Sequence, residues 1–170
     1  AKGEEDVRGN QTFDLRTGVH VKTAIEAPCL DLLGKMLGVT VSELLGEGQQ
    51  RDRVRMLGYL FFVGDPNKTD LEYLHEPDSD CTWYRIRHEE AMTPDKIVEF
   101  AKATQEKYGF TDFKLKGGVL PGDQEMECIR AKKKEFPDSR FDLDPNGGWL
   151  LEQAVEYVKG MQGILTYCED

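Results

Sequence analysis

Two lysines stand one residue apart near the middle of the chain, within Phe113-Lys114-Leu115-Lys116-Gly117-Gly118. Side chains alternate between the two faces of a strand, so in a strand Lys114 and Lys116 share one face. Neighbouring ammonium groups repel each other, and burial adds a desolvation cost. Such a pair is tolerated where an anion is held, or where one lysine must lose its proton near neutral pH. On this stretch alone, an edge strand with a solvated face is an equally good interpretation.

Carboxylates end the two strands that are expected next. Asp144-Pro145-Asn146-Gly147 closes a strand over residues 140–144, and Glu169-Asp170 closes a strand over residues 164–169. Carboxylates on adjacent strand ends lie about 5 Å apart and repel each other unless a cation lies between them. Oxygen ligands with no histidine or cysteine nearby favour a hard ion such as Mg²⁺. Each carboxylate alone is more often a turn or cap residue, but the ordered set predicts a site.

The elements that would position these groups alternate between helix and strand. The last helix is expected to turn Leu151, Ala154, Val155 and Val158 to one apolar side. The alternation predicts parallel pairing with right-handed crossovers, and hence an α/β fold. The charged groups then recur at the carboxyl ends of consecutive strands, which is the catalytic edge of a (β/α)₈ barrel. Helix and strand are predicted in turn over 93–107, 111–116, 123–135, 140–144, 151–161 and 164–169.

The first third of the chain predicts a small helical unit. Residues 1–19 are polar, lack a clear period and are interpreted as a loop. An amphipathic helix is expected over 25–37, with Pro28 in a position that should kink it unless it falls in the first turns. Thr40 with Glu43 forms a capping box for a second, short helix.

After Arg53 the chain becomes strongly apolar. Residues 54–63 are interpreted as a buried strand. The segment 64–92 is long for a loop of a compact domain, and such loops are either functional or disordered. Trp83 and Tyr84 within it favour a packed structure.

Composition excludes several classes of partner. The formal net charge of −10 argues against nucleic acid and against anionic membrane surfaces. The sequence has no run of about 18 apolar residues, and its charged start is not a signal peptide. A soluble, cytoplasmic protein is therefore expected. Four cysteines without C-x-x-C spacing predict free, mostly buried thiols: Cys29, Cys81, Cys128 and Cys168.

These residues resemble a known family, the glucarate dehydratase branch of the enolase superfamily. The resemblance rests on Lys114-x-Lys116, Asp144-Pro145-Asn146-Gly147 and Tyr167-Cys168-Glu169-Asp170. It runs nearly from end to end of the chain. Further similar stretches are Gln11–Thr17, Thr23–Ala27, Leu57–Gly64, Trp83–Arg85, Arg87–Pro94 and Phe113–Val119.

The resemblance implies a fold in two parts. Residues 1–53 would be the helical remainder of an N-terminal α+β capping domain, and residues 54–170 the first four strands of a (β/α)₇β barrel, a partial TIM-like barrel. A full barrel takes about 250 residues, so the chain is interpreted as an internal fragment, inactive by itself. The third metal ligand and a His–Asp pair would lie on later strands. The three histidines match no catalytic position and are expected to be structural or surface residues: His20, His75 and His88.

The resemblance also implies an activity in the breakdown of carbohydrate acids. The proton next to a carboxylate of D-glucarate, or of L-idarate, is removed and water is lost, giving 5-dehydro-4-deoxyglucarate. Lys116 would be the base, and Lys114 its neighbour at the substrate carboxylate. Asp144 and Glu169 would be two ligands of Mg²⁺. Three further residues would contact substrate: Thr12, Tyr59 and Asn146.

Several alternatives stay open at this point. The chain could belong to another acid-sugar dehydratase or to a racemase of the same superfamily. A non-catalytic relative or partner subunit is a second alternative, for which Pro28 and Leu150 are mild hints. A receiver-like domain with Asp144 as phosphate acceptor is disfavoured, because it needs acidic residues after the first strand and Tyr59 and Gly64 do not supply them. Assembly into a homo-oligomer is left open.

Overall fold

The computed structural model describes residues 13–70, 72 and 76–169. The chain divides into two compact units, with the boundary between Arg55 and Met56. Thr12, His75 and Asp170 lie outside the described residues. Among the helices of the described part, none combines the length and the apolar character needed to cross a membrane.

The first unit contains α1 (Phe13–Leu37) and α2 (Val41–Leu44). The expected start of the first helix was wrong, because the helix already begins at Phe13 and includes residues interpreted as a loop. Neither Gly18 nor Pro28 ends it. Glycine costs a helix about 1 kcal/mol, and a proline removes one backbone hydrogen bond, so both weaken a long helix without necessarily ending it. The predicted cap of the second helix is present, since the Thr40 N–H donates to the Glu43 carboxylate at 2.6 Å.

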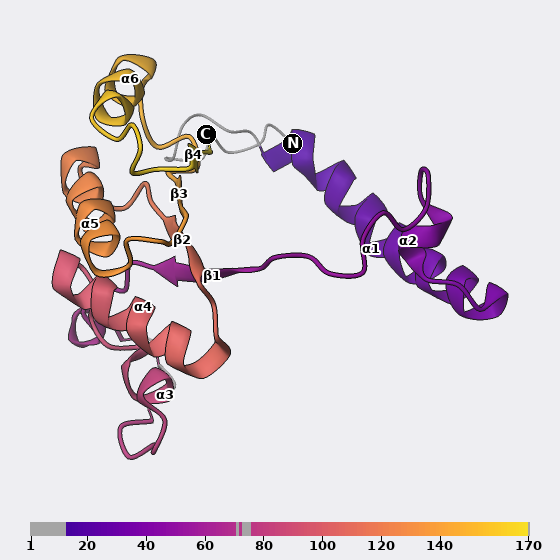
Figure 1. The fold of residues 1–170 in the computed structure, drawn as a ribbon, viewed down its shortest axis with the longest axis horizontal. Helices are drawn as coiled ribbons and strands as arrows, with labels where there is room; N and C mark the ends of the chain where they lie inside the picture. The colour runs from indigo at the N-terminus through magenta and orange to yellow at the C-terminus, as the bar shows by residue number, and fades with distance from the viewer. Residues whose placement is uncertain (1–12, 71, 73–75, 170) are drawn as a thin grey trace. The chain divides into compact units, whose positions relative to one another are not determined.

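The second unit is a parallel four-stranded sheet in the order β1-β2-β3-β4. α4, α5 and α6 lie on one face of it (Figure 1). The predicted parallel pairing with helical crossovers is confirmed, although the last strand is shorter than expected. The elements are β1 (Leu57–Phe61), the 3₁₀ turn η1 (Pro66–Lys68), α3 (Thr82–Ile86), α4 (Pro94–Tyr108), β2 (Asp112–Lys116), α5 (Gly122–Glu135), β3 (Phe141–Asp144), α6 (Leu151–Lys159) and β4 (Tyr167–Cys168).

The register gives the sheet one apolar and one polar face. Leu60, Leu115 and Leu143 pair across three strands and pack toward the helices. Tyr59 and Lys114 pair one position earlier and therefore point to the opposite face. The core between sheet and helices is fully or almost fully buried and contains Leu60, Ile97, Ala101, Phe113, Leu115, Met126, Cys128, Ile129, Phe141 and Leu143.

The expectation of a wholly buried strand over 54–63 was wrong in two respects. β1 is only five residues long, and Tyr59 and Phe61 on its polar-side face are 39% and 47% exposed. Only alternate residues of this strand meet the helix layer, so Gly58 and Leu60 are buried while their neighbours are not. The high apolar content of the stretch concealed this alternation.

The segment between β1 and α4 is packed, as its aromatic residues predicted. The rings of Trp83 and Tyr108 meet edge to face with their centroids 5.3 Å apart. The Arg87 guanidinium lies 5.0 Å from the Trp83 ring and forms an ion pair with Glu76 at 2.7 Å. His88 is half-buried in this segment, and His20 is exposed on α1.

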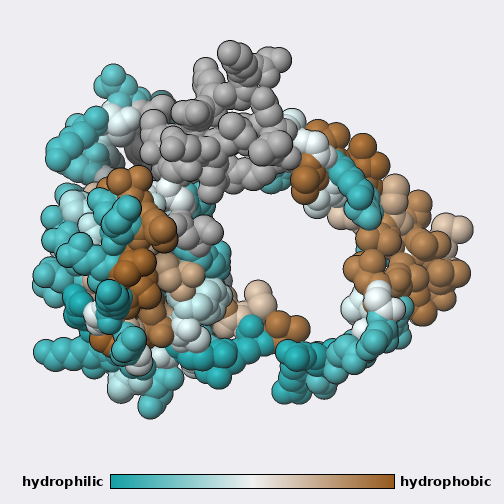
Figure 2. Space-filling model, turned by 90° about the horizontal axis from the view of Figure 1, so that it is seen from above, coloured by the Kyte–Doolittle hydropathy of each residue, from teal (hydrophilic) through white to brown (hydrophobic). Residues whose placement is uncertain are grey.

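The expectation of mostly buried cysteines was wrong, because only Cys128 of the four free cysteines is buried and Cys29 is exposed. On the apolar side of α6, Leu151 and Val155 are 76% and 45% exposed, because no described element covers that side of the helix. Figure 2 shows apolar side chains at the surface of both units. A groove of about 420 Å³ beside α6 is lined mainly by Trp149, Ala154, Val155, Val158 and Cys168.

Candidate active site

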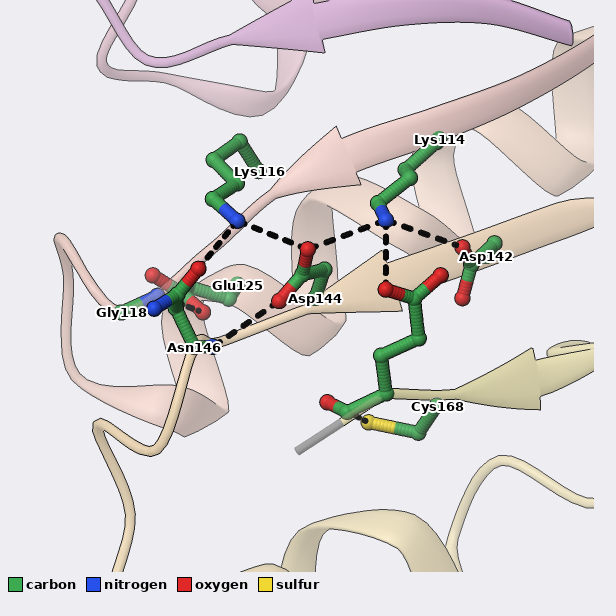
Figure 3. Close-up of polar contacts among 9 residues, drawn as sticks. Lys114, Lys116, Gly118, Glu125, Asp142, Asp144, Asn146 and Cys168 are labelled. Carbon is green, nitrogen blue, oxygen red and sulfur yellow. Dashed lines mark hydrogen bonds and ion pairs between the residues drawn. The ribbon is translucent and has the colours of Figure 1, made fainter. Parts of the chain in front are cut away.

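Lys116 ends β2 at the rim of the sheet, opposite Asp144 at the end of β3. Its Nζ donates to Asp144 Oδ2 at 2.7 Å and to the side-chain oxygen of Asn146 (Figure 3). The Lys116 side chain is 20% exposed and that of Asp144 is 10% exposed. Because parallel strands end at one edge, the pairing of Lys116 with Asp144 follows directly from the register.

Lys114, two residues earlier on the same face, is the ammonium group around which the carboxylates gather. Its Nζ lies 2.9 Å from Asp144 Oδ2, 2.7 Å from Glu169 Oε2 and 3.8 Å from Asp142 Oδ2. The Tyr59 ring centroid is 5.3 Å away. Two ammonium groups thus face three carboxylates, which leaves this rim with one formal negative charge.

The electrostatics keep both central groups ionised. Burial opposes protonation of Lys114, but the hydrogen bonds to Glu169 and Asp144 outweigh it and raise the pKa of the amine. Burial likewise favours a neutral Asp144, but the hydrogen bonds from Lys116 and Lys114 hold the pKa of this carboxyl below its ordinary value. Burial, and then the nearby Glu169, raise the pKa of Asp142. Lys114 is therefore a fixed cation and Asp144 a fixed anion.

The loops after β2 and β3 fit closely together. Asn146 has a φ of +58°, and its N–H donates to Asp144 Oδ1 at 3.0 Å. Gly118 has a φ of +73°, and a Cβ there would lie 2.2 Å from the carbonyl oxygen of Pro145. Only glycine allows this approach, and the contact keeps Asn146 within reach of Lys116.

Most of the predicted site residues come together on this rim. Lys114, Lys116, Asp144, Asn146 and Glu169 form one network of short contacts, and the Tyr59 ring lies beside it. Thr12 lies outside the described residues.

Sequence reasoning missed two members of this neighbourhood. Asp142 shares the polar face with Asp144, and the same period of two that paired the lysines would have found it. Glu125 anchors the loop after Lys116 from the helix side. Its position one turn before the buried Ile129 was the available signal.

The donor set of the rim suits a hard divalent cation. Carboxylate oxygens of Asp144 and Glu169 converge on the ammonium of Lys114, so the two carboxylates already face a shared positive charge. Oxygen donors are those that Mg²⁺ prefers, and this ion usually takes one or two carboxylates with waters or substrate. Within the described residues no group of three or more His, Cys, Asp or Glu side chains is arranged to hold a metal. The rim thus offers two ligands of a larger set.

Parallel βα units with acid–base groups at the strand ends define a barrel-type enzyme domain, and comparison with known proteins agrees. Residues 96–170 match the family described as enolase C-terminal domain-like. The chain is 38% identical to a probable glucarate dehydratase of Streptomyces coelicolor, over 99% of this chain and 37% of that protein. Residues 96–170 are therefore part of an enolase-superfamily C-terminal domain, as the motifs predicted, and the similarity over the rest of the chain supports a fragment of such a protein.

Solved structures show the same fold. An enolase-type structure from Thermobispora bispora, complexed with magnesium and formate, matches with a TM-score of 0.74 and 34% identity, over 100% of this chain and 37% of that one. Another from Mycobacterium smegmatis, complexed with tartrate, matches with a TM-score of 0.67 and 38% identity, over 84% of this chain and 31% of that one. The predicted partial TIM-like barrel is confirmed. The chain spans between 31% and 37% of the length of these relatives.

Proposed function

We propose that these residues supply the proton-abstracting half of a Mg²⁺-dependent acid-sugar dehydratase that acts on D-glucarate. The observation that carries the proposal is the convergence of Lys114, Lys116, Asp144 and Glu169 on one rim. A lysine base beside Mg²⁺ is the arrangement recorded for enolase-type sites. The similarity to a probable glucarate dehydratase supports the choice of reaction.

Lys116 is the proposed base. Its Nζ is held at the rim by Asp144 and Asn146, where a substrate lying over the strand ends would present its α-carbon. In the reacting state the amine is neutral and takes the α-proton. Lys114 remains an ammonium and stabilises the negative charge that develops on the substrate carboxylate.

Asp144 and Glu169 are the proposed metal ligands. When bound, Mg²⁺ supplies Lewis-acid stabilisation of the carboxylate charge as the α-proton leaves. With a divalent ion the formal charge of the rim would change from −1 to +1 with Lys116 protonated and to 0 with Lys116 neutral. In either state the rim would no longer carry a net negative charge toward a dicarboxylate substrate. A protein with a net charge of −10 needs such a local positive field to bind a dianion.

The substrate contacts are proposed for Tyr59 and Asn146, which border Lys114 and Lys116, and for Thr12. We propose that residues 1–53 belong to the capping domain and that L-idarate is an alternative substrate. The product would be 5-dehydro-4-deoxyglucarate. Because the relatives are almost three times as long, the activity is proposed for the full-length protein that contains these residues.

The test is exchange of substrate α-protons in D₂O, followed by NMR over a panel of hexarates and hexonates. The full-length protein with Mg²⁺ should exchange and dehydrate D-glucarate, and Lys116→Ala should lose at least 10³-fold in rate. Lys102→Ala on α4, which removes an exposed lysine, is the matched control and should retain activity. Exchange with hexonates but not with glucarate would overturn the assignment of D-glucarate as substrate. Exchange that persists in Lys116→Ala would overturn the assignment of Lys116 as the base.

A further inference from the structure

Glu125 is a buried carboxylate, and within the described part of the chain its hydrogen bonds go to a single loop. It lies in the first turn of α5 and has no exposed surface. Its Oε1 accepts from the N–H groups of Val119 and Leu120, both at 2.9 Å. Its Oε2 accepts from the N–H of Gly118 at 3.2 Å (Figure 3). A buried charge is costly unless hydrogen bonds satisfy it. Three convergent donors meet that requirement, so the loop and the carboxylate hold each other.

The loop that Glu125 holds begins directly after Lys116. A Cβ on Gly117 would lie 2.5 Å from Glu125 Oε2, so the carboxylate packs against the backbone next to the lysine. The Gly117 N–H donates to the Asp144 carbonyl at 2.8 Å. The backbone that carries Lys116 is therefore fixed from the helix side and from β3.

The same loop also supports Asn146. Gly118 packs against the Pro145 carbonyl so closely that no side chain fits between them. Asn146 follows Pro145 and accepts a hydrogen bond from the Lys116 ammonium. Displacing the loop would thus disturb Lys116 both through its own backbone and through the amide that orients its Nζ.

We propose that Glu125 is a positioning residue for Lys116, acting through the loop of residues 117–120. The effect of Glu125 on catalysis rests on the proposed function, whereas its effect on the position of Lys116 does not. A residue that only anchored α5 would affect stability and leave the reactivity of Lys116 unchanged, so the two roles can be separated.

Three variants of the full-length protein, loaded with Mg²⁺, test the assignment. Glu125→Gln keeps the size of the side chain but removes its charge and one acceptor oxygen. Glu127→Gln makes the same chemical change at an exposed position of the same helix and is the matched control. Gly117→Ala leaves Glu125 intact but places a methyl group 2.5 Å from its Oε2, which disturbs the same contact from the other side.

The first readout is the rate at which trace acetic anhydride acetylates Lys116, measured by mass spectrometry relative to Lys102. Glu125→Gln and Gly117→Ala should change the relative rate at Lys116 at least threefold, and Glu127→Gln should not. The second readout is kinetic: kcat should fall about 10–100-fold with KM nearly unchanged, because the base is misplaced while substrate binding persists.

An equal labelling rate and an equal kcat in Glu125→Gln and Glu127→Gln, with only a lower Tm for the former, would overturn the positioning role. Should Glu125→Gln not fold, Gly117→Ala decides by the same two readouts. A wild-type protein that turns over no acid sugar would refute the proposed function instead. In that case unchanged labelling of Lys116 would overturn the role of Glu125, and changed labelling would support it.

Discussion

Lys132 on α5 is a fully buried lysine whose Nζ has no hydrogen-bond acceptor among the described residues. Burial lowers its pKa to about 7, although the neighbouring Cys128 and Asp142 act in the opposite direction. In the unfolded chain a lysine has a pKa of about 10.4. We expect Lys132→Met, which keeps the length of the side chain without its charge, to stabilise the chain.

The sign and size of this effect follow from proton linkage. Below pH 7 the amine is protonated in both states, so the folded state bears the full cost of the buried charge. Between pH 7 and about 10 only the unfolded state holds the proton, and the cost falls by about 1.4 kcal/mol per pH unit. The stability of the native chain should therefore rise with pH over this window relative to the variant. The gain in Lys132→Met is at most about 5 kcal/mol at pH 6 and is nearly gone at pH 10.

Urea unfolding of the chain at pH 6, 7, 8.5 and 10 measures this difference. Lys134→Met, at an exposed position two residues along the same helix, is the control and should show no such pH dependence. A difference between Lys132→Met and the native chain that stays constant from pH 6 to 10 would refute the assignment of a depressed pKa. A Lys132→Met variant that is less stable than the native chain at every pH would refute the claim that the buried charge of Lys132 destabilises the fold.

Two further predictions concern the rim. Asp144→Asn removes the carboxylate that pairs with both lysines and should cost about 3 kcal/mol at pH 7. The pKa of Asp144 is lowered in the folded state, so its stabilisation is present above about pH 4 and is lost as the pH falls. The difference in free energy of unfolding between the native chain and Asp144→Asn, measured with urea, should therefore be smaller at pH 3 than at pH 7. An equal difference at both pH values would contradict this. Gly118→Ala, with its left-handed φ and a Cβ 2.2 Å from Pro145 O, should lower stability by at least about 2 kcal/mol in the same assay, and an unchanged midpoint would disprove the close approach.

The second half of the fold could be predicted because each of its signals agrees with the others. Thr93 caps α4, Pro94 begins it, and Gly109 with a φ of +73° ends it. The alternation of Lys114 and Lys116 with buried apolar residues defines the polar face of β2. In a parallel sheet the order of the strands then brings their polar ends to one edge.

The rest depended on information that local patterns do not carry. The polar residues before Ile25 gave no period, yet α1 starts at Phe13, because a helix tolerates isolated poor formers within a long run. Leu151 and Val155 have helical spacing, but their exposure depends on what packs against α6. Asp142 and Glu125 had local signals, but the reason for burying each carboxylate lies in the folded structure. Asp142 faces Lys114 on the neighbouring strand, and Glu125 accepts from the loop that packs back onto α5.

The central claim is that two ammonium groups and two carboxylates share one rim with a divalent cation. Paramagnetic Mn²⁺, used in place of Mg²⁺, should broaden the ε-CH₂ NMR signals of Lys114 and Lys116 in the full-length protein and leave that of Lys102 sharp. Asp144→Asn should remove the broadening at stoichiometric Mn²⁺. Equal broadening of all three lysines, or sharp signals from Lys114 and Lys116 at saturating Mn²⁺, would contradict the account.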